Sequence, residues 1–365
     1  GFVVNSESYK SVFDSNPIDN LLESTDRTNY GVGINKGTIA VNGTNSIAFA
    51  MLKGGDSSNS GDLIVNPLTA GGAQKSTAFY GEQGNFANSG NITVNTPANT
   101  GNIGVLLKGP NTATPINFTN TGNISVQGGG NIGVYGEGTY TFNHEKNTAG
   151  TNKISVGSDA IGIYAKEASG TLNIKAPIDI AASGTGTTIG IYSDGEAKVN
   201  FGDDSKLTIG TGAVGLYSSV ATKFGNTFKV ETGKSLEVEL GQNSTFGLLN
   251  GNSGEVNVGT YLNSNPINIS NFGNGASIFY TTGGVTANLD QNYTVSTPTA
   301  GTNTSTSVLV ASNNSTVKNT ATLTTNTNIG LIATKGTGTG ASTAQNDGTI
   351  VSTRDSGIGI YTNES

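Results

Sequence analysis

Hydrophobic and polar residues along this chain form short runs that return at a nearly constant interval. The clearest run reads Ile161-Gly162-Ile163-Tyr164, with apolar residues at its first, third and fourth positions. Strict and looser versions follow one another, and their second positions are residues 48, 78, 104, 133, 162, 190, 215, 247, 278, 308, 330 and 359. Their mean spacing is near 28 residues. A period of roughly 20–50 residues indicates a solenoid, a propeller or another repeat array.

Each period also contains two further short runs. One follows an Asn-x-Gly turn and alternates apolar and polar residues, as in Asn88-Ser89-Gly90-Asn91-Ile92-Thr93-Val94. The other precedes that turn, as in Lys198-Val199-Asn200-Phe201. Alternation with a period of two is typical of a strand that buries one face. The pattern therefore predicts three short strands per period, and it lacks the periodicity of helices.

Three strands in each coil of about 28 residues predict an all-β fold, a right-handed parallel β-helix. A propeller is the competing architecture, but its blades need four strands and roughly 40–50 residues. We assign residues 31–365 to the repeats. Residues 1–30 carry more charge and are expected to form a cap, an inserted loop or an atypical first coil, with one possible helical turn at 20–24. Because the sequence ends inside a copy of the repeat, we expect a fragment of a longer protein.

Composition narrows the classes of function. Only 34% of the 365 residues are hydrophobic and 54 are glycine, but charged residues reach only 12%, which argues for an ordered β-rich chain and against disorder. A net charge of −7 without a basic stripe excludes an evident nucleic-acid surface. Without cysteine there is no disulfide framework and no thiolate metal site. No apolar run approaches the ~18 residues of a membrane helix, and no signal peptide is visible at the first residues.

The tyrosine column permits two interpretations. Tyr135, Tyr164, Tyr192 and Tyr217 occupy the fourth position of successive runs. They could form an external aromatic ladder for sugars or for a partner protein, or they could pack at a corner of the coil and seal the core. Other runs place aliphatic residues there, namely Leu106, Leu249, Val310 and Ile332. This exchange favours packing, and the preceding glycine indicates close approach of the backbone.

Motifs that carry chemistry elsewhere are weak here. Gly128–Gly133 and Gly210–Gly215 match G-x-G-x-x-G, but each precedes a strand, whereas a dinucleotide site needs a helix after the motif. The segment 56–62 resembles half of a calcium loop, but Pro67 stands where the bidentate glutamate belongs, so we interpret it as a solvated turn. Asp203-Asp204 offers paired carboxylates of the kind that glycosidases use, without supporting elements around it. We therefore expect no catalytic, cofactor or metal residues and no enzymatic activity.

Two connections between strands are longer or more charged than the others, at 136–153 and 218–239. Insertions of solenoids often carry binding functions, although a solvated loop is the plainer interpretation. The residues that we name as possible contacts to a partner are Glu137, Tyr140, His144, Glu145, Lys146, Lys223, Lys229 and Glu231.

The pairing of Asn-x-Gly-x-Ile-x-Val with Ile-Gly-Ile-Tyr every ~28 residues, over roughly 30–365, resembles the passenger regions of type V (classical) autotransporters. The similarity is greatest to the large outer-membrane adhesins of fusobacteria. The resemblance implies a secreted parallel β-helix that is joined to a C-terminal translocator barrel and adheres to other bacteria or host cells. This chain lacks a signal peptide, a barrel and a terminal cap, and no family binding residues can be transferred to it.

The resulting expectation is a surface-exposed adhesin passenger that acts as an elongated rod. We expect a monomer at the cell surface, anchored at the bacterial outer membrane only through a barrel outside this chain. Its partner would be a protein or glycan receptor on a host cell or bacterium. The alternatives are a β-helical polysaccharide-degrading enzyme and a phage-type fibre, in which the repeat would more often trimerise.

Overall fold

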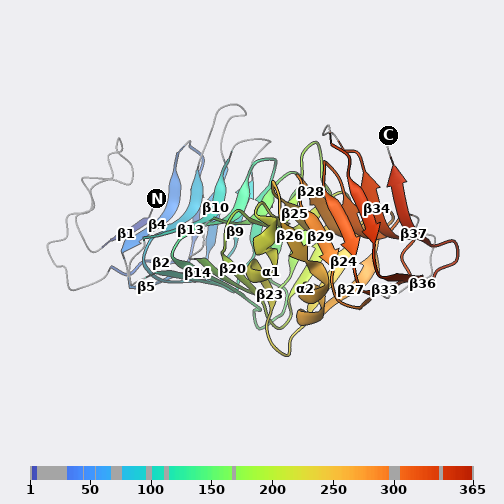
Figure 1. Ribbon diagram of the computed structural model, residues 1–365. Helices are drawn as coiled ribbons and strands as arrows, with labels where there is room; N and C mark the ends of the chain where they lie inside the picture. The colour runs from blue at the N-terminus through green and yellow to red at the C-terminus, as the bar shows by residue number, and fades with distance from the viewer. Residues whose placement is uncertain are drawn as a thin grey trace.

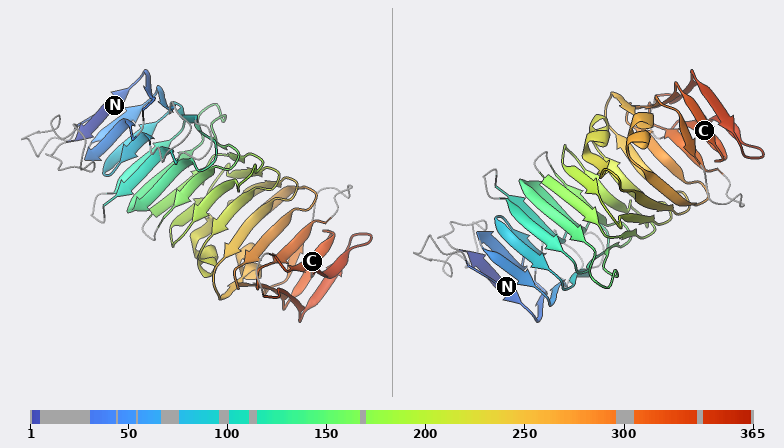
Figure 2. Two further views of the ribbon diagram at one scale, coloured as in Figure 1. Left: turned by 90° about the horizontal axis from the view of Figure 1, so that it is seen from above. Right: turned by 90° about the horizontal axis from the view of Figure 1, so that it is seen from below.

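The protein is a rod of stacked β-coils, as a computed structural model shows (Figure 1). It describes residues 2–5, 31–43, 45–53, 55–66, 76–95, 101–110, 115–166, 170–295, 305–336 and 340–363. Each coil contains about 29 residues, and the neighbouring strands of every sheet are equivalent strands of adjacent coils that pair in parallel. The predicted parallel β-helix, with three strands per coil, is therefore confirmed. Figure 2 shows the full length of the rod from two opposite sides.

One wall of the rod is an unbroken sheet of thirteen strands, which we call the long sheet. It is built from the Ile-Gly-Ile-Tyr runs, and its order follows the chain. Its strands are β1 (Phe2–Asn5), β4 (Ile47–Lys53), β7 (Thr77–Gly81), β10 (Ile103–Gly109), β13 (Ile132–Gly138), β16 (Ile161–Ala165), β19 (Ile189–Ser193), β22 (Val214–Ser218), β25 (Thr245–Asn250), β28 (Ser277–Thr282), β31 (Ser307–Ala311), β34 (Ile329–Thr334) and β37 (Ile358–Asn363).

The second wall follows the long sheet in each coil and consists of two sheets in succession. The first has eight strands: β2 (Ile34–Asn35), β5 (Asp56–Asn59), β8 (Gly84–Asn88), β11 (Ile116–Asn120), β14 (Tyr140–Glu145), β17 (Gly170–Lys175), β20 (Lys198–Phe201) and β23 (Phe228–Val230). The other has four: β26 (Glu255–Asn257), β29 (Thr286–Leu289), β32 (Thr316–Asn319) and β35 (Thr343–Asn346).

The third wall closes each coil and is also divided into two sheets. Nine strands form the first: β3 (Thr38–Val41), β6 (Asp62–Val65), β9 (Ile92–Asn95), β12 (Ile124–Gln127), β15 (Ile154–Val156), β18 (Ile178–Ile180), β21 (Lys206–Ile209), β24 (Leu236–Leu240) and β27 (Ile267–Phe272). The remaining three are β30 (Tyr293–Val295), β33 (Thr322–Thr325) and β36 (Thr349–Ser352).

The core is one continuous column inside the three walls, because the register places like residues on like. Ile124 of β12 lies between Ile92 and Ile154 of the neighbouring strands. Phe118 lies between Phe86 and Phe142 in the second wall, with ring centroids 5.2 and 5.8 Å away. Each coil therefore buries its apolar face between its own walls and against the coils before and after it, which is the usual arrangement of a solenoid.

The Asn-x-Gly turns form a ladder of amides inside the corner between the second and third walls. Asn59 donates its Nδ2 to Asn88 Oδ1 at 2.6 Å, and Asn88 donates to Asn120 at 2.6 Å. Each amide also donates to the carbonyl oxygen of its own turn glycine, as Asn88 does to Gly90 at 3.0 Å. Glycine is required because a Cβ on Gly90 would lie 1.8 Å from the carbonyl oxygen of the preceding turn. The ladder satisfies the hydrogen-bonding groups of these buried amides.

Two short helices interrupt the regular succession of strands, α1 (Phe224–Thr227) and α2 (Val258–Ser264). A 3₁₀ turn at Ala221–Lys223 leads into α1. Figure 2 shows both helices on the same side of the rod. Phe224 and Tyr261 insert their rings into the core, with centroids 5.1 Å apart, and each also contacts Phe279. The second wall is interrupted between β23 and β26, and the third between β27 and β30.

Three sequence-based expectations need correction. At 245–250 the register is displaced by one residue, because Gly247 pairs with Leu216 and Leu248, not Leu249, occupies the tyrosine column. The cause is steric, since a Cβ on Gly247 would lie 2.6 Å from the Phe279 ring that fills this space. The solvated turn predicted at 56–62 is largely strand β5. Helix α2 was not predicted.

Residues 1–30 begin with a strand of the long sheet, because β1 pairs in parallel with β4. The helical turn predicted at 20–24 lies outside the described residues. In contrast, both G-x-G-x-x-G motifs lie in turns before strands of the long sheet, as expected; Gly128 and Gly212 have φ values of +82° and +68°.

Candidate functional site

The tyrosine column lies on the outer face of the long sheet, so the prediction that it seals the core is wrong. In β16, Ile163 and Ala165 are buried and belong to the core, whereas Tyr164 between them is partly exposed. The same burial pattern holds in β13, β19 and β22. Because successive side chains of a strand point to opposite faces, an inward Ile163 places Tyr164 outside the rod.

The four tyrosines form a continuous aromatic ladder along the rod. The register pairs Tyr135 with Tyr164, Tyr164 with Tyr192, and Tyr192 with Tyr217. Their ring centroids are 5.1, 4.7 and 4.6 Å apart in that order. The first two pairs meet edge to face, whereas the planes of the third pair are 14° apart. Both arrangements are favourable for aromatic pairs.

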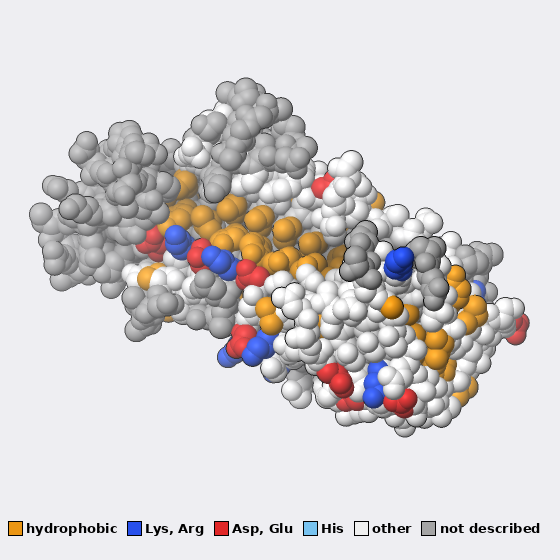
Figure 3. All heavy atoms as spheres, turned by 45° about the horizontal axis from the view of Figure 1, so that its top comes forward, with side chains coloured by type: hydrophobic (Ala, Val, Ile, Leu, Met, Phe, Trp, Pro, Cys, Tyr) orange, Lys and Arg blue, Asp and Glu red, His pale blue; other side chains and the backbone are white. Residues whose placement is uncertain are grey.

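An aliphatic column runs beside the tyrosines on the same outer face. It consists of the first residues of the runs, which pair in register as Ile103, Ile132, Ile161, Ile189 and Val214. None of these five side chains belongs to the core cluster, but Ile189 and Val214 are buried beneath their outer-face neighbours, with 7% and 5% of each residue exposed. The two columns together are called the apolar stripe, and Figure 3 shows a hydrophobic band on this face of the rod. Toward β4 and β7 the outer face carries a separate hydrophobic cluster of Ala50, Leu52 and Tyr80.

A row of charged residues follows the tyrosine column along one border of the stripe. Lys108 pairs in register with Glu137, while Lys166 and Asp194 occupy the corresponding positions of the next two coils. Glu82 continues the row on the other side. The sign alternates from coil to coil, and Figure 3 shows acidic and basic groups alternating beside the hydrophobic band. Lys166 Nζ lies 3.0 Å from Glu137 Oε1. We call Glu82, Lys108, Glu137, Lys166 and Asp194 the charged row.

Hydrogen bonds join the ladder to its border and fix the orientation of its rings. The Tyr164 hydroxyl donates to Asp194 Oδ2 at 2.6 Å, and the Tyr80 hydroxyl donates to Glu82 Oε1 at the same distance. The Tyr217 hydroxyl accepts from Asn250 Nδ2 at 2.7 Å. Partial burial, with the adjacent Asp194 carboxylate, raises the pKa of Tyr164 far above its usual value, so this hydroxyl stays protonated.

Two of the predicted contact residues cannot touch a partner because they lie inside the rod. Tyr140 is 1% exposed, and His144 is completely buried. In β14 the inward positions are Tyr140, Phe142 and His144. Tyr140 fills the space that Gly136 and Gly170 leave free, where a Cβ would lie 2.1 and 2.3 Å from its ring. Burial raises the pKa of the Tyr140 hydroxyl well above its usual value.

His144 ends the amide ladder of the Asn-x-Gly turns. Asn120 Nδ2 lies 3.0 Å from His144 Nδ1. An amide nitrogen only donates, so Nδ1 accepts and the imidazole is neutral with its proton on Nε2. Within the described part of the chain, Nε2 has no hydrogen-bond partner. Burial lowers the pKa of His144 to about 4, although the backbone groups of Pro177 and Asn120 partly oppose this.

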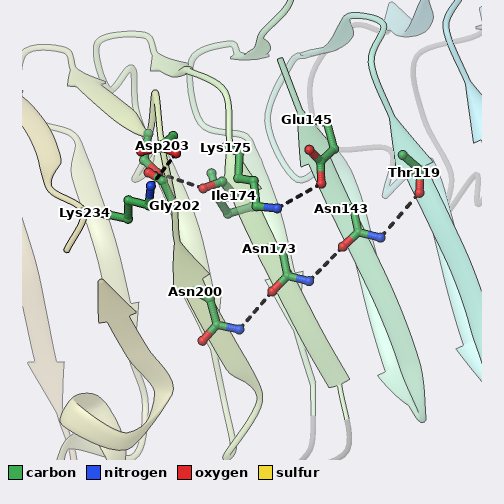
Figure 4. A network of polar contacts seen from close by, with 11 residues as sticks. Thr119, Asn143, Glu145, Asn173, Ile174, Lys175, Asn200, Gly202, Asp203 and Lys234 are labelled. Carbon is green, nitrogen blue, oxygen red and sulfur yellow. Dashed lines mark hydrogen bonds and ion pairs between the residues drawn. The ribbon is translucent and has the colours of Figure 1, made fainter. Parts of the chain in front are cut away.

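The structure does bring the two predicted loops together at one corner, which Figure 4 shows. From the first loop, Glu145 pairs with Lys175 at 3.3 Å and Lys146 pairs with Asp204 at 2.8 Å. From the second, Lys234 pairs with Asp203 at 2.6 Å. A Cβ on Gly202 would lie 3.1 Å from a carboxylate oxygen of Glu231, so Glu231 belongs to the same corner.

The remaining predicted residues are dispersed. Glu137 belongs to the charged row, Lys223 pairs with Glu196, and Lys229 is exposed on β23. Below the corner, amides of the outer face form a second ladder, in which Asn200 donates to Asn173 at 2.9 Å and Asn173 donates to Asn143 at 2.8 Å (Figure 4). Half of the loop predicted at 136–153 is strand, because β13 and β14 occupy it to Glu145.

Asp203 and Asp204 each form an ion pair with a different lysine, Lys234 and Lys146, and both aspartates are largely exposed. This arrangement differs from two carboxylates that face each other across a substrate. Across the described ranges, three or more histidine, aspartate or glutamate residues do not cluster in a way that could hold a metal ion. In the same ranges, no helix is long and apolar enough to cross a membrane.

Comparison with models of protein families, with curated proteins and with solved structures finds no match to this chain. The candidate site therefore depends on geometry alone. The site is the apolar stripe with its charged row. Strand alternation could have identified it, because an inward residue at the third position of an Ile-Gly-Ile-Tyr run requires an outward residue at the fourth.

Proposed function

We propose that this chain is the rod of a surface adhesin, a segment of an autotransporter passenger that binds other bacteria or host cells through the apolar stripe. In this proposal the protein lies outside the cell and is attached to the outer membrane through a translocator barrel beyond these residues. The rod acts by contact repeated along its length, without covalent chemistry.

The observation that carries the proposal is the aromatic ladder on the outside of the long sheet. Interior residues of a solenoid are needed for folding, but an outward column of tyrosines, paired over four consecutive coils, is not needed to close the core. Contiguous apolar surface on a soluble protein commonly marks an interaction site. Tyrosine is enriched at such sites because one ring provides a large contact area at a small entropic cost.

Repetition suits adhesion, because weak contacts at successive coils add up when they engage one partner together. The gain comes from the effective concentration of the second site once the first is bound. The hydroxyl bonds from Tyr164 and to Tyr217 hold the rings in place before a partner arrives. Rings that are already ordered lose less entropy on binding.

The test is binding of the fluorescently labelled chain to bacteria and to epithelial cells, measured by flow cytometry. A double variant, Tyr164→Ser with Tyr192→Ser, removes the middle of the ladder. We expect its binding to fall at least about tenfold, as when central aromatic residues of an interface are truncated. Asn173→Ala is the matched control, since it removes one member of a ladder on the outer face of a different wall.

Circular dichroism and urea unfolding must show that both variants retain the fold. Equal binding by the folded double variant and the parent chain would refute the proposal. Turnover of a polysaccharide that Asp203→Ala abolishes would instead support the enzyme alternative, and a stable trimer in sedimentation would support the fibre.

A further inference from the structure

We infer that the apolar stripe between β10 and β22 binds an uncharged linear glycan that lies along the rod. This inference depends on the proposed function, which it extends by naming the class of ligand. The shape, the spacing and the charge of the stripe all limit which kind of ligand can occupy it.

The stripe is long and narrow. Each coil contributes only two outward apolar side chains, such as Ile161 and Tyr164, and the coils follow at the strand spacing of ~4.8 Å. Five coils therefore give a track about 20 Å long and two side chains wide. A specific protein interface needs roughly 800 Å² and 20–30 residues on each partner. A track of this shape fits a single chain better than a folded domain.

The period of the track discriminates between kinds of chain. An extended peptide repeats its side chains on one face about every 6.6 Å, so it moves out of step with the coils. Pyranose units joined end to end repeat at close to the coil spacing. One sugar unit per coil therefore meets a tyrosine ring together with a member of the charged row at β13, β16 and β19, whereas β10 provides Leu106 in place of a ring.

The chemistry across the track also matches a sugar unit. A pyranose has an apolar face of C–H groups and an edge of hydroxyls. Aromatic rings attract C–H groups through their negative faces, and ammonium and carboxylate groups form strong hydrogen bonds with hydroxyls. The stripe places these two kinds of group side by side, as Tyr164 and Asp194 illustrate at 2.6 Å.

The balance of charge points to a neutral polymer. The charged row alternates in sign, with acidic groups at Glu82, Glu137 and Asp194 and basic groups at Lys108 and Lys166. A strongly anionic chain such as heparin would meet a carboxylate at every second coil, and the whole protein carries a net charge of −7. Alternation offers donors and acceptors in turn without a net field that attracts ions.

The experiment is affinity gel electrophoresis of the full chain through gels that contain galactan, mannan, a soluble β-glucan or heparin. We expect retardation by at least one neutral polysaccharide, and little by heparin. Tyr164→Ala should weaken the retarding interaction about tenfold, as for the loss of a central aromatic contact. Tyr164→Phe keeps the ring and should weaken it less, and Asn173→Ala should leave it unchanged.

Each other outcome overturns the inference. The inference is wrong if no neutral polysaccharide retards the chain, if Tyr164→Ala leaves the retardation unchanged, or if heparin retards the chain more strongly than the neutral polysaccharides do. Sedimentation adds one more, because self-association that Tyr164→Ala abolishes would assign the stripe to a second copy of this chain. If glycan binding fails while cell binding still depends on the tyrosines, the adhesive function stands and only the ligand class is wrong.

Discussion

Acid should loosen the rod at one identifiable coil, because its only histidine is buried in the neutral form. Burial lowers the pKa of His144 to about 4 in the folded chain, against roughly 6.5 when unfolded. Between these values the unfolded chain binds a proton that the folded chain does not. The contribution of His144 to stability is therefore complete above pH ~7, is lost progressively as the pH falls, and changes no further below pH ~4.

The magnitude follows from the two pKa values. At pH 5 the folded state loses about 2 kcal/mol relative to pH 7, and at pH 4 about 3 kcal/mol. Protonation at Nδ1 would also replace the acceptor that holds Asn120 with a donor, at the end of the amide ladder. The charged residues that directly follow this position in β14 and β17, Glu145 and Lys175, pair with each other on the outside. At the ring's own position, the adjacent coils have Asn120 and Ile174, which do not titrate.

Two measurements test this reasoning. A single histidine gives one imidazole Cε1–Hε1 signal in a histidine-labelled sample, so its titration by NMR reports this pKa directly. Urea unfolding at pH 7 and pH 5 then compares the chain with His144→Asn, which restores the asparagine of the preceding turns. The carboxylates titrate equally in both chains, so the difference between them isolates His144.

We expect the parent chain to lose about 2 kcal/mol more unfolding free energy between pH 7 and pH 5 than the His144→Asn variant loses. A histidine signal that titrates near pH 6.5, or stability losses that agree between the two chains within about 0.5 kcal/mol, would show that the ring is not held as the structure places it.

Four further predictions concern packing, the acidic pair and assembly. Gly90→Ala should destabilise the chain by more than about 2 kcal/mol in urea unfolding, because its Cβ would meet the Gly61 carbonyl. Gly37→Ala is the control and should be nearly neutral, because Gly37 has open space at the same motif position. Equal effects of the two variants would contradict the ladder geometry. Gly170→Ala should destabilise the coil, because its Cβ would overlap the Tyr140 ring. Adding Tyr140→Leu to the same chain should recover part of the lost unfolding free energy, and the absence of recovery would contradict this contact. Asp203→Ala should leave cell binding and the thermal midpoint unchanged, since its ion pair with Lys234 is exposed; lost binding would assign this corner a function. Sedimentation velocity should show an elongated monomer, and a stable trimer would refute that expectation.

The repeat was sufficient to predict the architecture, because each strand signal recurs at the same phase of every coil. Where the prediction failed, the cause was a contact between coils. The register at 245–250 shifts because the ring of Phe279 takes the space beside Gly247. Helix α2 is only seven residues long, too short for a recognisable helical period, and its formation depends on the burial of Tyr261.

The candidate site was harder to predict than the fold, although part of its signal was present. In the sequence, exchange of tyrosine with leucine, valine and isoleucine favours an interior position. The same exchange occurs outside, because each outer side chain packs on its equivalents in neighbouring coils. His144 follows Phe142 by two residues and so shares its inward face, which strand alternation alone could have shown. The pairing of Lys146 with Asp204 crosses 58 residues and could not be predicted from the repeat.

The interrupted walls also determine how the rod responds to force. Its strands lie across the axis, so the backbone hydrogen bonds between coils run along it and carry any tension together. Most boundaries between coils are held on three sides, but the boundary before β25 lacks pairing in the second wall, and the next one lacks pairing in the third. At these two boundaries the long sheet shares the load with one other wall and with the rings of Phe224, Tyr261 and Phe279. Tension along the axis would therefore stretch the rod first around β25 and would spare the coils on either side.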